Sequence, residues 1–154
     1  MIDTEKYHNL LRLINPKYIR LLFPIEKCPI PLIGEDIKRH LRNSESVLIC
    51  AATLGEVFDR LLRQLQVDDM AGAVFLDSLA GEYLEKFIDN SDRELTDERK
   101  LSMRYSPGYG DFPLSVNRDI IEVLNASTRI GLCVTDDYIL TPQKSITGLI
   151  GVRA

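Results

Sequence analysis

The sequence predicts an α+β fold in which helices flank a mainly antiparallel, twisted β-sheet. Residues 46–53 form a short, continuously apolar run, which is typical of a strand covered on both faces. Further short segments with strand character lie in the last third of the chain, and helical periodicity dominates before them. We therefore expect helices around one sheet whose strands lie near residues 46–53, 101–104, 130–134, 138–141 and 145–152.

Length and charge limit the class of protein. A chain of 154 residues has the usual size of one domain, so we expect a single domain over residues 1–154, with residues 1–45 as N-terminal helices and an arm packed on the body. The net charge is −4 and no long basic run occurs, which argues against nucleic acid and anionic membranes as partners. No apolar run approaches the roughly 18 residues of a membrane helix. We expect a cytoplasmic protein.

The N-terminal third begins with an amphipathic helix, capped by Asp3 or Thr4 and stopped by an Asn-Pro pair. Residues 17–22 either extend the helical pattern or form a strand. Three prolines then predict an irregular, extended segment up to Leu32, and a short helix follows over residues 34–41.

The predicted central strand ends in a glycine turn that opens a second long helical pattern. A helix is expected over residues 56–65, and Thr53 and Gly55 lie beside its N-terminus. Such a corner is a weak signal for an anion or ligand site. The helix is expected to face the core with Val57, Leu61, Leu62 and Leu65.

The longest predicted helix covers residues 70–87 and is capped by Asp68 or Asp69. One of its faces is rich in small residues, and Asp77 falls inside that face. A buried carboxylate needs a cation or several N–H donors, so Asp77 is a candidate site residue. Glu82 lies about 140° further round the helix and is alternatively a solvated partner of the lysine four residues later.

Residues 90–100 are polar and read as a loop or a frayed helix end, and the least generic stretch of the sequence follows at residues 104–113. Pro107-Gly108 is the central pair of a type II turn. Gly108 and Gly110 carry no Cβ, so a ligand can approach the main chain there. This stretch is either a rigid ligand loop or a tight surface turn with an aromatic plug.

The C-terminal part is predicted to begin with a helix over residues 115–124. Two short strands, residues 130–134 and 138–140, are then joined by a turn. The final strand contains Gly148 and Gly151, and glycines inside a strand indicate that another part of the structure approaches closely.

The cysteines and histidines give no sign of a metal site or of a catalytic group. Cys28, Cys50 and Cys133 are scattered and form no C-x-x-C pair, and the latter two lie in apolar runs where we expect small buried side chains. His8 and His40 lack the neighbours of a metal-binding helix face and are predicted to be surface residues. No nucleophile with a histidine partner is visible, which argues against a hydrolase.

The segment Arg104-Tyr105-Ser106-Pro107-Gly108-Tyr109 resembles the Arg-x-x-Pro-Gly-Tyr signature of the activation domain of cobalamin-dependent methionine synthase. Three other segments resemble further blocks of that family in the same order, and the likeness covers about residues 46–151. These segments are Ala51 to Gly55, the helix through Asp77 and Glu82, and Pro142 to Gly148. The chain is shorter than the full activation domain and resembles its compact stand-alone relatives.

The resemblance implies a site for S-adenosylmethionine. Arg104 matches the arginine that binds this cofactor, Ser106 the small residue whose backbone touches it, and Tyr109 a tyrosine of its pocket. Glu82 matches the helix glutamate. Where the family has Arg-Pro-Ala-Pro-Gly-Tyr-Pro, this chain departs at Tyr105, Ser106 and Gly110.

The chemical groups of S-adenosylmethionine lead to a similar assignment of roles to these residues. S-adenosylmethionine carries a carboxylate, an ammonium and an adenine face, so its site needs a bidentate cation, a carboxylate and an aromatic surface. Arg104 supplies the cation, Glu82 or Asp77 the carboxylate, and Tyr109 or Tyr105 the aromatic surface. None of these residues has to act as an acid or base, and no catalytic residue is predicted.

The implied function is reductive remethylation of a cobalamin-dependent methionine synthase, or of a related corrinoid methyltransferase, by a module that acts in trans. Cobalamin would lie on the partner, and an electron-donor protein is an additional candidate partner. The alternative is a non-catalytic docking partner of a corrinoid protein that retains the fold without cofactor binding.

Overall fold

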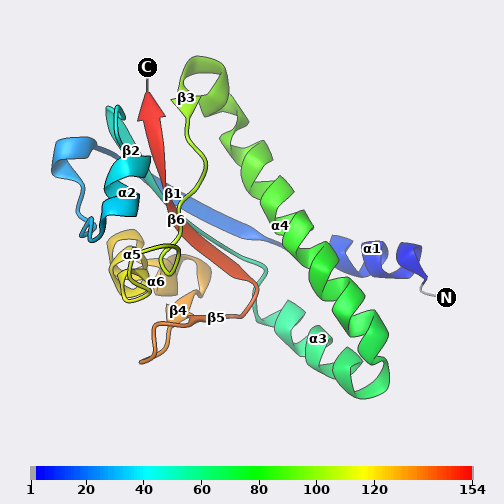
Figure 1. Ribbon diagram of the computed structural model, residues 1–154. Helices are drawn as coiled ribbons and strands as arrows, with labels where there is room; N and C mark the ends of the chain where they lie inside the picture. The colour runs from blue at the N-terminus through cyan, green and yellow to red at the C-terminus, as the bar shows by residue number, and fades with distance from the viewer. Residues whose placement is uncertain (1–2, 154) are drawn as a thin grey trace.

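The computed structural model describes residues 3–153, and it has the predicted α+β architecture. A four-stranded sheet has the order β1-β2-β6-β3, and each neighbouring pair is antiparallel. Its strands are β1 (Lys17–Pro24), β2 (Ser46–Thr53), β3 (Lys100–Leu101) and β6 (Ser145–Arg153). The helices lie on both sides of the sheet, with α1, α3 and α4 on one side and α2, α5 and α6 on the other (Figure 1).

The remaining elements are short except for α3 and α4. Strands β4 (Cys133–Val134) and β5 (Leu140–Thr141) form a separate two-stranded ribbon beside α5. The helices are α1 (Thr4–Arg12), the 3-10 helix η1 (Ile25–Lys27), α2 (Glu35–His40), α3 (Glu56–Asp68), α4 (Met70–Glu98), α5 (Val116–Leu124) and α6 (Ala126–Ile130).

Strand β2 is buried on both faces, as its sequence predicts. Side chains alternate along a strand, so Val47, Ile49 and Ala51 enter the core below α2, α5 and α6. Leu48 and Cys50 point to the opposite side, towards α4. Burial raises the pKa of the Cys50 thiol to about 12, so this cysteine stays protonated and serves as a small hydrophobic side chain.

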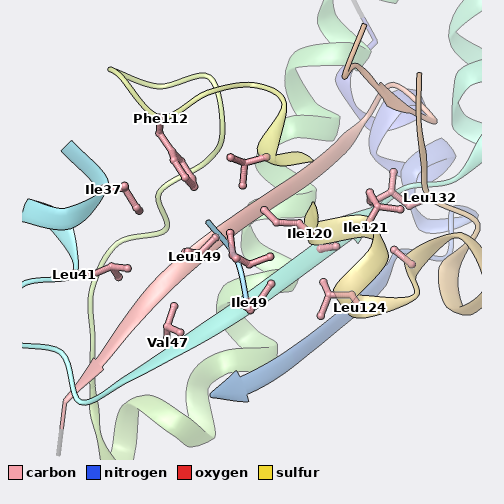
Figure 2. Close-up of a cluster of buried hydrophobic side chains, with 14 of the residues drawn as sticks. Ile37, Leu41, Val47, Ile49, Phe112, Ile120, Ile121, Leu124, Leu132 and Leu149 are labelled. Atoms are coloured by element: carbon pink, nitrogen blue, oxygen red, sulfur yellow. The ribbon is translucent and has the colours of Figure 1, made fainter. Parts of the chain in front are cut away.

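The core on the α5 side joins several segments of the chain. Ile37 enters it from α2, Leu41 from the end of that helix, Ile120 from α5, Leu149 from β6 and Phe112 from the loop before α5 (Figure 2). All five side chains are at most 5% exposed. This core ties the loop of residues 104–113 to the sheet.

Helix α4 packs on the other side through a stripe that differs from the predicted one. The buried residues are Ala73, Leu76, Ala80, Leu84 and Ile88, at spacings of three and four. The expectation that Asp77 is buried is wrong, since its side chain is 49% exposed. Ala73 and Ala80 of the small-residue face stay in the buried stripe, and Leu76 and Ile88 extend it, so the stripe leaves Asp77 at its margin.

Polar contacts position both ends of α4. Asp69, rather than Asp68, caps the helix, because its Oδ1 accepts the Gly72 N–H at 3.0 Å and its Oδ2 accepts the Tyr7 hydroxyl of α1 at 2.7 Å. Near the other end, the buried Asp92 accepts hydrogen bonds from Tyr18 and Arg20 of β1. These contacts fix α4 across the sheet from α1 to the edge strand β1.

Several local expectations are corrected. Residues 17–22, left open between helix and strand, belong to the edge strand β1, and α4 continues through most of residues 90–100. Val57 is 57% exposed instead of buried, while Phe58 and Asp59 turn inward. Ile130 ends α6 instead of starting the strand predicted over residues 130–134, which is reduced to β4. Cys133 is exposed because β4 pairs only with the outlying β5.

The glycines of the final strand predict that another part of the structure approaches it closely, and at Gly148 that part is Arg104. Gly148 pairs with Cys50 across the sheet, and a Cβ at this position would collide with the Arg104 Cγ and lie 2.8 Å from the Arg104 Cδ and 3.0 Å from the Tyr105 oxygen. The bare backbone of β6 is therefore the surface on which the stem of Arg104 lies.

We expect Gly148→Ala to lower the free energy of unfolding by about 1–3 kcal/mol, because the extra methyl overpacks a filled site. Gly81→Ala is the matched control, since nothing lies within 4 Å of its Cβ position in the middle of α4. This control should stabilise the protein by roughly 0.5–1 kcal/mol. Urea unfolding of both variants measures the difference, and equal effects would contradict the packing explanation.

Candidate functional site

The loop of residues 104–113 is anchored to β6 at its start and folds into the predicted type II turn. Tyr105 and Leu149 exchange two backbone hydrogen bonds of 2.9 Å each. The Tyr109 N–H then donates to the Ser106 oxygen at 3.3 Å, and Gly108 has a φ of 96°. A positive φ at this turn position favours glycine.

The loop has features of both structures that its sequence predicts, a ligand loop and a turn with an aromatic plug. Phe112 is only 1% exposed and plugs the loop into the core, whereas Tyr109 is 64% exposed. The Gly108 N–H donates to the Phe112 oxygen at 2.8 Å, which closes the loop on itself. The buried plug thus holds the backbone while Tyr109 remains available at the surface.

Asp111 fixes the far end of the loop to α2. Its Oδ2 accepts the Glu35 N–H at 2.7 Å and its Oδ1 accepts the Asp36 N–H at 2.9 Å, while Asp36 accepts the Asp111 N–H in return at 3.1 Å. The carboxylate therefore caps a helix from a distant part of the chain. The backbone N–H groups of Asp36 and Glu35 lower the pKa of the Asp111 carboxyl.

The anchored loop forms one wall of a cleft of about 480 Å³. The β4–β5 hairpin, the start of β6, α5 and α4 form the remaining walls. The residues that line it are Glu85, Arg104, Ser106, Pro107, Gly108, Tyr109, Leu114, Asn117, Tyr138, Ile139, Leu140, Gln143, Ser145, Ile146 and Thr147. This volume lies within the range of small-molecule sites.

Arg104 is the cation of this cleft. Its side chain is 14% exposed, and its Nη2 contacts both carboxylate oxygens of Glu85, at 2.7 and 2.8 Å. Among the described residues, no partner contacts Nε or Nη1 of Arg104. The pair therefore leaves part of the guanidinium and a half-exposed carboxylate side by side at the cleft.

Four other residues that line the cleft are joined by a chain of hydrogen bonds. The Ser106 hydroxyl donates to the Thr147 oxygen at 2.6 Å, and the Thr147 hydroxyl donates to Asn117 Oδ1 at 2.7 Å. The Asn117 amide then donates to the Tyr138 oxygen at 3.0 Å. This chain holds the loop, β6, α5 and the hairpin in one arrangement.

The structure brings four of the six predicted site residues to one cleft, namely Arg104, Ser106, Gly108 and Tyr109. The two acids lie elsewhere. Glu82 is exposed and lines a different groove, against α1. Asp77 pairs with Lys144 at 2.9 Å and does not line the cleft.

Glu85 is the acidic residue of the cleft, although the sequence pattern did not indicate it. It follows Leu84 directly, so it lies about 100° from the buried stripe of α4, on the flank that faces Arg104. Leu76, Ala80 and Leu84 also belong to the predicted stripe, so the helical register alone did not indicate that Glu85 lies at the cleft.

The arrangement supports binding of a charged organic ligand. Among the side chains that the structure describes, no cluster of three His, Cys, Asp or Glu is placed to hold a metal ion. Nor is any helix in this part of the chain long and apolar enough to cross a membrane.

Comparisons with known proteins identify the family and the fold. A family model described as "Vitamin B12 dependent methionine synthase, activation domain" matches residues 58–153. The crystal structure of the MetH reactivation domain bound to AdoHcy aligns with 96% of this chain at a TM-score of 0.70 and 17% identity, which confirms the predicted fold. The chain spans 63% of the length of that solved chain. No curated protein matches it.

Asp111 should contribute to stability at neutral pH and lose this contribution in acid. Its folded pKa is lowered, so the contribution is complete above the unfolded pKa and disappears as the pH falls through the folded value. We expect the melting temperature of Asp111→Asn to fall less than that of the wild type between pH 7 and about pH 3. Asp136→Asn, at an exposed turn, is the control and should keep the wild-type slope.

Proposed function

Because the chain belongs to the activation-domain family of vitamin B12 dependent methionine synthase, we propose that its cleft binds S-adenosylmethionine. The bound cofactor would serve the reductive remethylation of a cobalamin-dependent methionine synthase or related corrinoid methyltransferase, with the chain acting in trans. The observation that carries the proposal is the Arg104–Glu85 pair at the cleft, beside Tyr109.

The two charges match the amino-acid end of the cofactor. The free edge of the Arg104 guanidinium suits the ligand carboxylate, because planar N–H donors pair with a carboxylate in two places. The Glu85 carboxylate, 49% exposed, suits the ammonium group. The short distance between Arg104 and Glu85 matches the short distance between the two charges of an α-amino acid.

The uncharged walls suit the remainder of the cofactor. The Tyr109 ring offers an aromatic surface, and Gly108 exposes backbone without a side chain. Asn117 and Thr147 also line the cleft; both are almost fully buried and joined by a hydrogen bond, so this wall is ordered before a ligand binds. An aromatic surface and open backbone suit an adenine and a ribose.

The role of the protein in this reaction is positioning. S-adenosylmethionine supplies a sulfonium methyl group, the partner's reduced corrinoid supplies the nucleophile, and a separate donor supplies the electron. The residues of the cleft orient the cofactor and exclude water from it. No proton has to be transferred by the protein.

The mouth of the cleft suits a large apolar partner. Tyr109, Leu114 and Ile139 line it, and their side chains are 64%, 38% and 53% exposed. Exposed apolar residues next to a ligand site often mark an interaction surface. The corrinoid protein is the proposed occupant of this surface.

A second candidate function is docking on a corrinoid protein without cofactor binding. One observation favours it: both carboxylate oxygens of Glu85 already contact Arg104. In this case the ion pair would be structural and the cleft would remain without a ligand.

Isothermal titration with S-adenosylmethionine distinguishes these functions. We expect micromolar binding by the wild type and a loss of roughly tenfold or more in Arg104→Ala, because the ligand carboxylate loses its cation. Glu85→Gln should also bind more weakly. Arg60→Ala, on an exposed part of α3, is the control and should bind like the wild type.

A titration without heat for the folded wild type would contradict cofactor binding. The docking function is then tested by a pull-down of the corrinoid protein. Equal capture by the wild type and Arg104→Ala would support it.

A further inference from the structure

A second cleft, of about 620 Å³, lies at the end of the sheet where α3 begins. It is bounded by the end of α1, the first residue of β1, the turn after β2, the first turns of α3 and the segment that enters β6. Its charged lining residues are Lys17, Glu56, Asp59 and Arg63, and its polar ones include Asn15, Thr53, Cys133 and Thr141.

Asp59 is the unusual residue of this cleft. It is only 7% exposed, and its Oδ2 accepts the Gln143 N–H at 2.9 Å. Its Oδ1 is buried and has no hydrogen-bond partner. A buried carboxylate oxygen without a donor is costly, so an oxygen of this kind beside a cleft indicates a missing donor.

Two basic side chains line the same cleft. Lys17 and Arg63 are exposed, and no residue within the described part of the chain forms a hydrogen bond or ion pair with either. Helix α3 also begins at Gly55 without a side-chain cap, so N–H groups of its first turn remain available to an anion. The cleft therefore offers an acceptor for a cation and several donors for an anion.

The charge balance selects the class of ligand. Lys17 and Arg63 offset Glu56 and Asp59, so neither a simple cation nor a simple anion is favoured by the whole cleft. A molecule with both charges can satisfy Asp59 and the basic groups at once.

We propose that this cleft binds a small zwitterion whose ammonium group donates to Asp59 Oδ1. Its carboxylate lies towards Lys17, Arg63 and the N-terminus of α3. This site is separate from the cleft of Arg104 and does not depend on the function proposed for that cleft. The two clefts are neighbours, because Gln143, bound to Asp59, lines the first cleft, and Pro142 lines the second.

A series of ω-amino acids from glycine to 6-aminohexanoate tests the proposal and measures the distance between the two charged subsites. Titrations of the ¹⁵N-labelled protein should show saturable amide shifts at Gln143 and in the first turn of α3, with one chain length preferred. Asp59→Asn should weaken this binding roughly tenfold or more, because an amide N–H replaces the acceptor. Arg63→Gln should weaken it as well.

Two variants serve as controls. Arg60→Gln removes an exposed charge from α3 outside the cleft, and Arg104→Ala alters the first cleft; both should bind the preferred probe like the wild type. If Asp59→Asn does not fold, binding of the probe to Lys17→Gln and Arg63→Gln tests the proposal instead, because both residues are exposed.

The proposal is overturned if no probe saturates below roughly 100 mM, a weaker affinity than ordinary small-molecule sites show. It is also overturned if folded Asp59→Asn, or the pair Lys17→Gln and Arg63→Gln, binds like the wild type. A loss of binding in Arg104→Ala would place the probe in the first cleft and contradict a separate site.

Discussion

The cleft of Arg104 depends on one contact, between the stem of Arg104 and the bare backbone of β6 at Gly148. The contact allows the chain after β3 to lie directly on the sheet. It also directs the guanidinium towards Glu85 on α4. Tyr105, the residue after Arg104, is hydrogen-bonded to Leu149, the residue after Gly148. These adjacent contacts set the direction in which the loop leaves the sheet, and with it the position of Tyr109.

Two further contacts make this loop rigid. Phe112 is buried beside Leu149 and Ile120, and the Asp111 carboxylate holds the N-terminus of α2 (Figure 2). A loop fixed at its start, middle and end loses little conformational entropy when a ligand binds. The loop therefore needs no rearrangement to present Tyr109 and the backbone of Gly108.

The parts of the fold that local sequence determines were predictable. The apolar run of β2 and the Pro107-Gly108 turn each follow from residues within a few positions. The exact buried face of α4 was not predictable in this way, because Ala73, Leu76, Ala80 and Leu84 belong to both the predicted and the observed stripe. Tertiary packing buries Ile88 as well and leaves Asp77 half-exposed, and Glu85 then lies at the cleft. The same applies to Asp59, whose burial depends on Gln143, a residue distant in the sequence.

The absence of a side chain at Gly148 also distinguishes related chains that can place the motif arginine in this position from those that cannot. A chain can keep the Arg-x-x-Pro-Gly-Tyr motif and still be unable to place its arginine, if a larger residue stands at this position of the final strand. The loop motif and the glycine, about forty residues apart in the sequence, form one structural unit. Chains that retain the motif without the glycine would be expected to have lost the arginine's position first and its function with it.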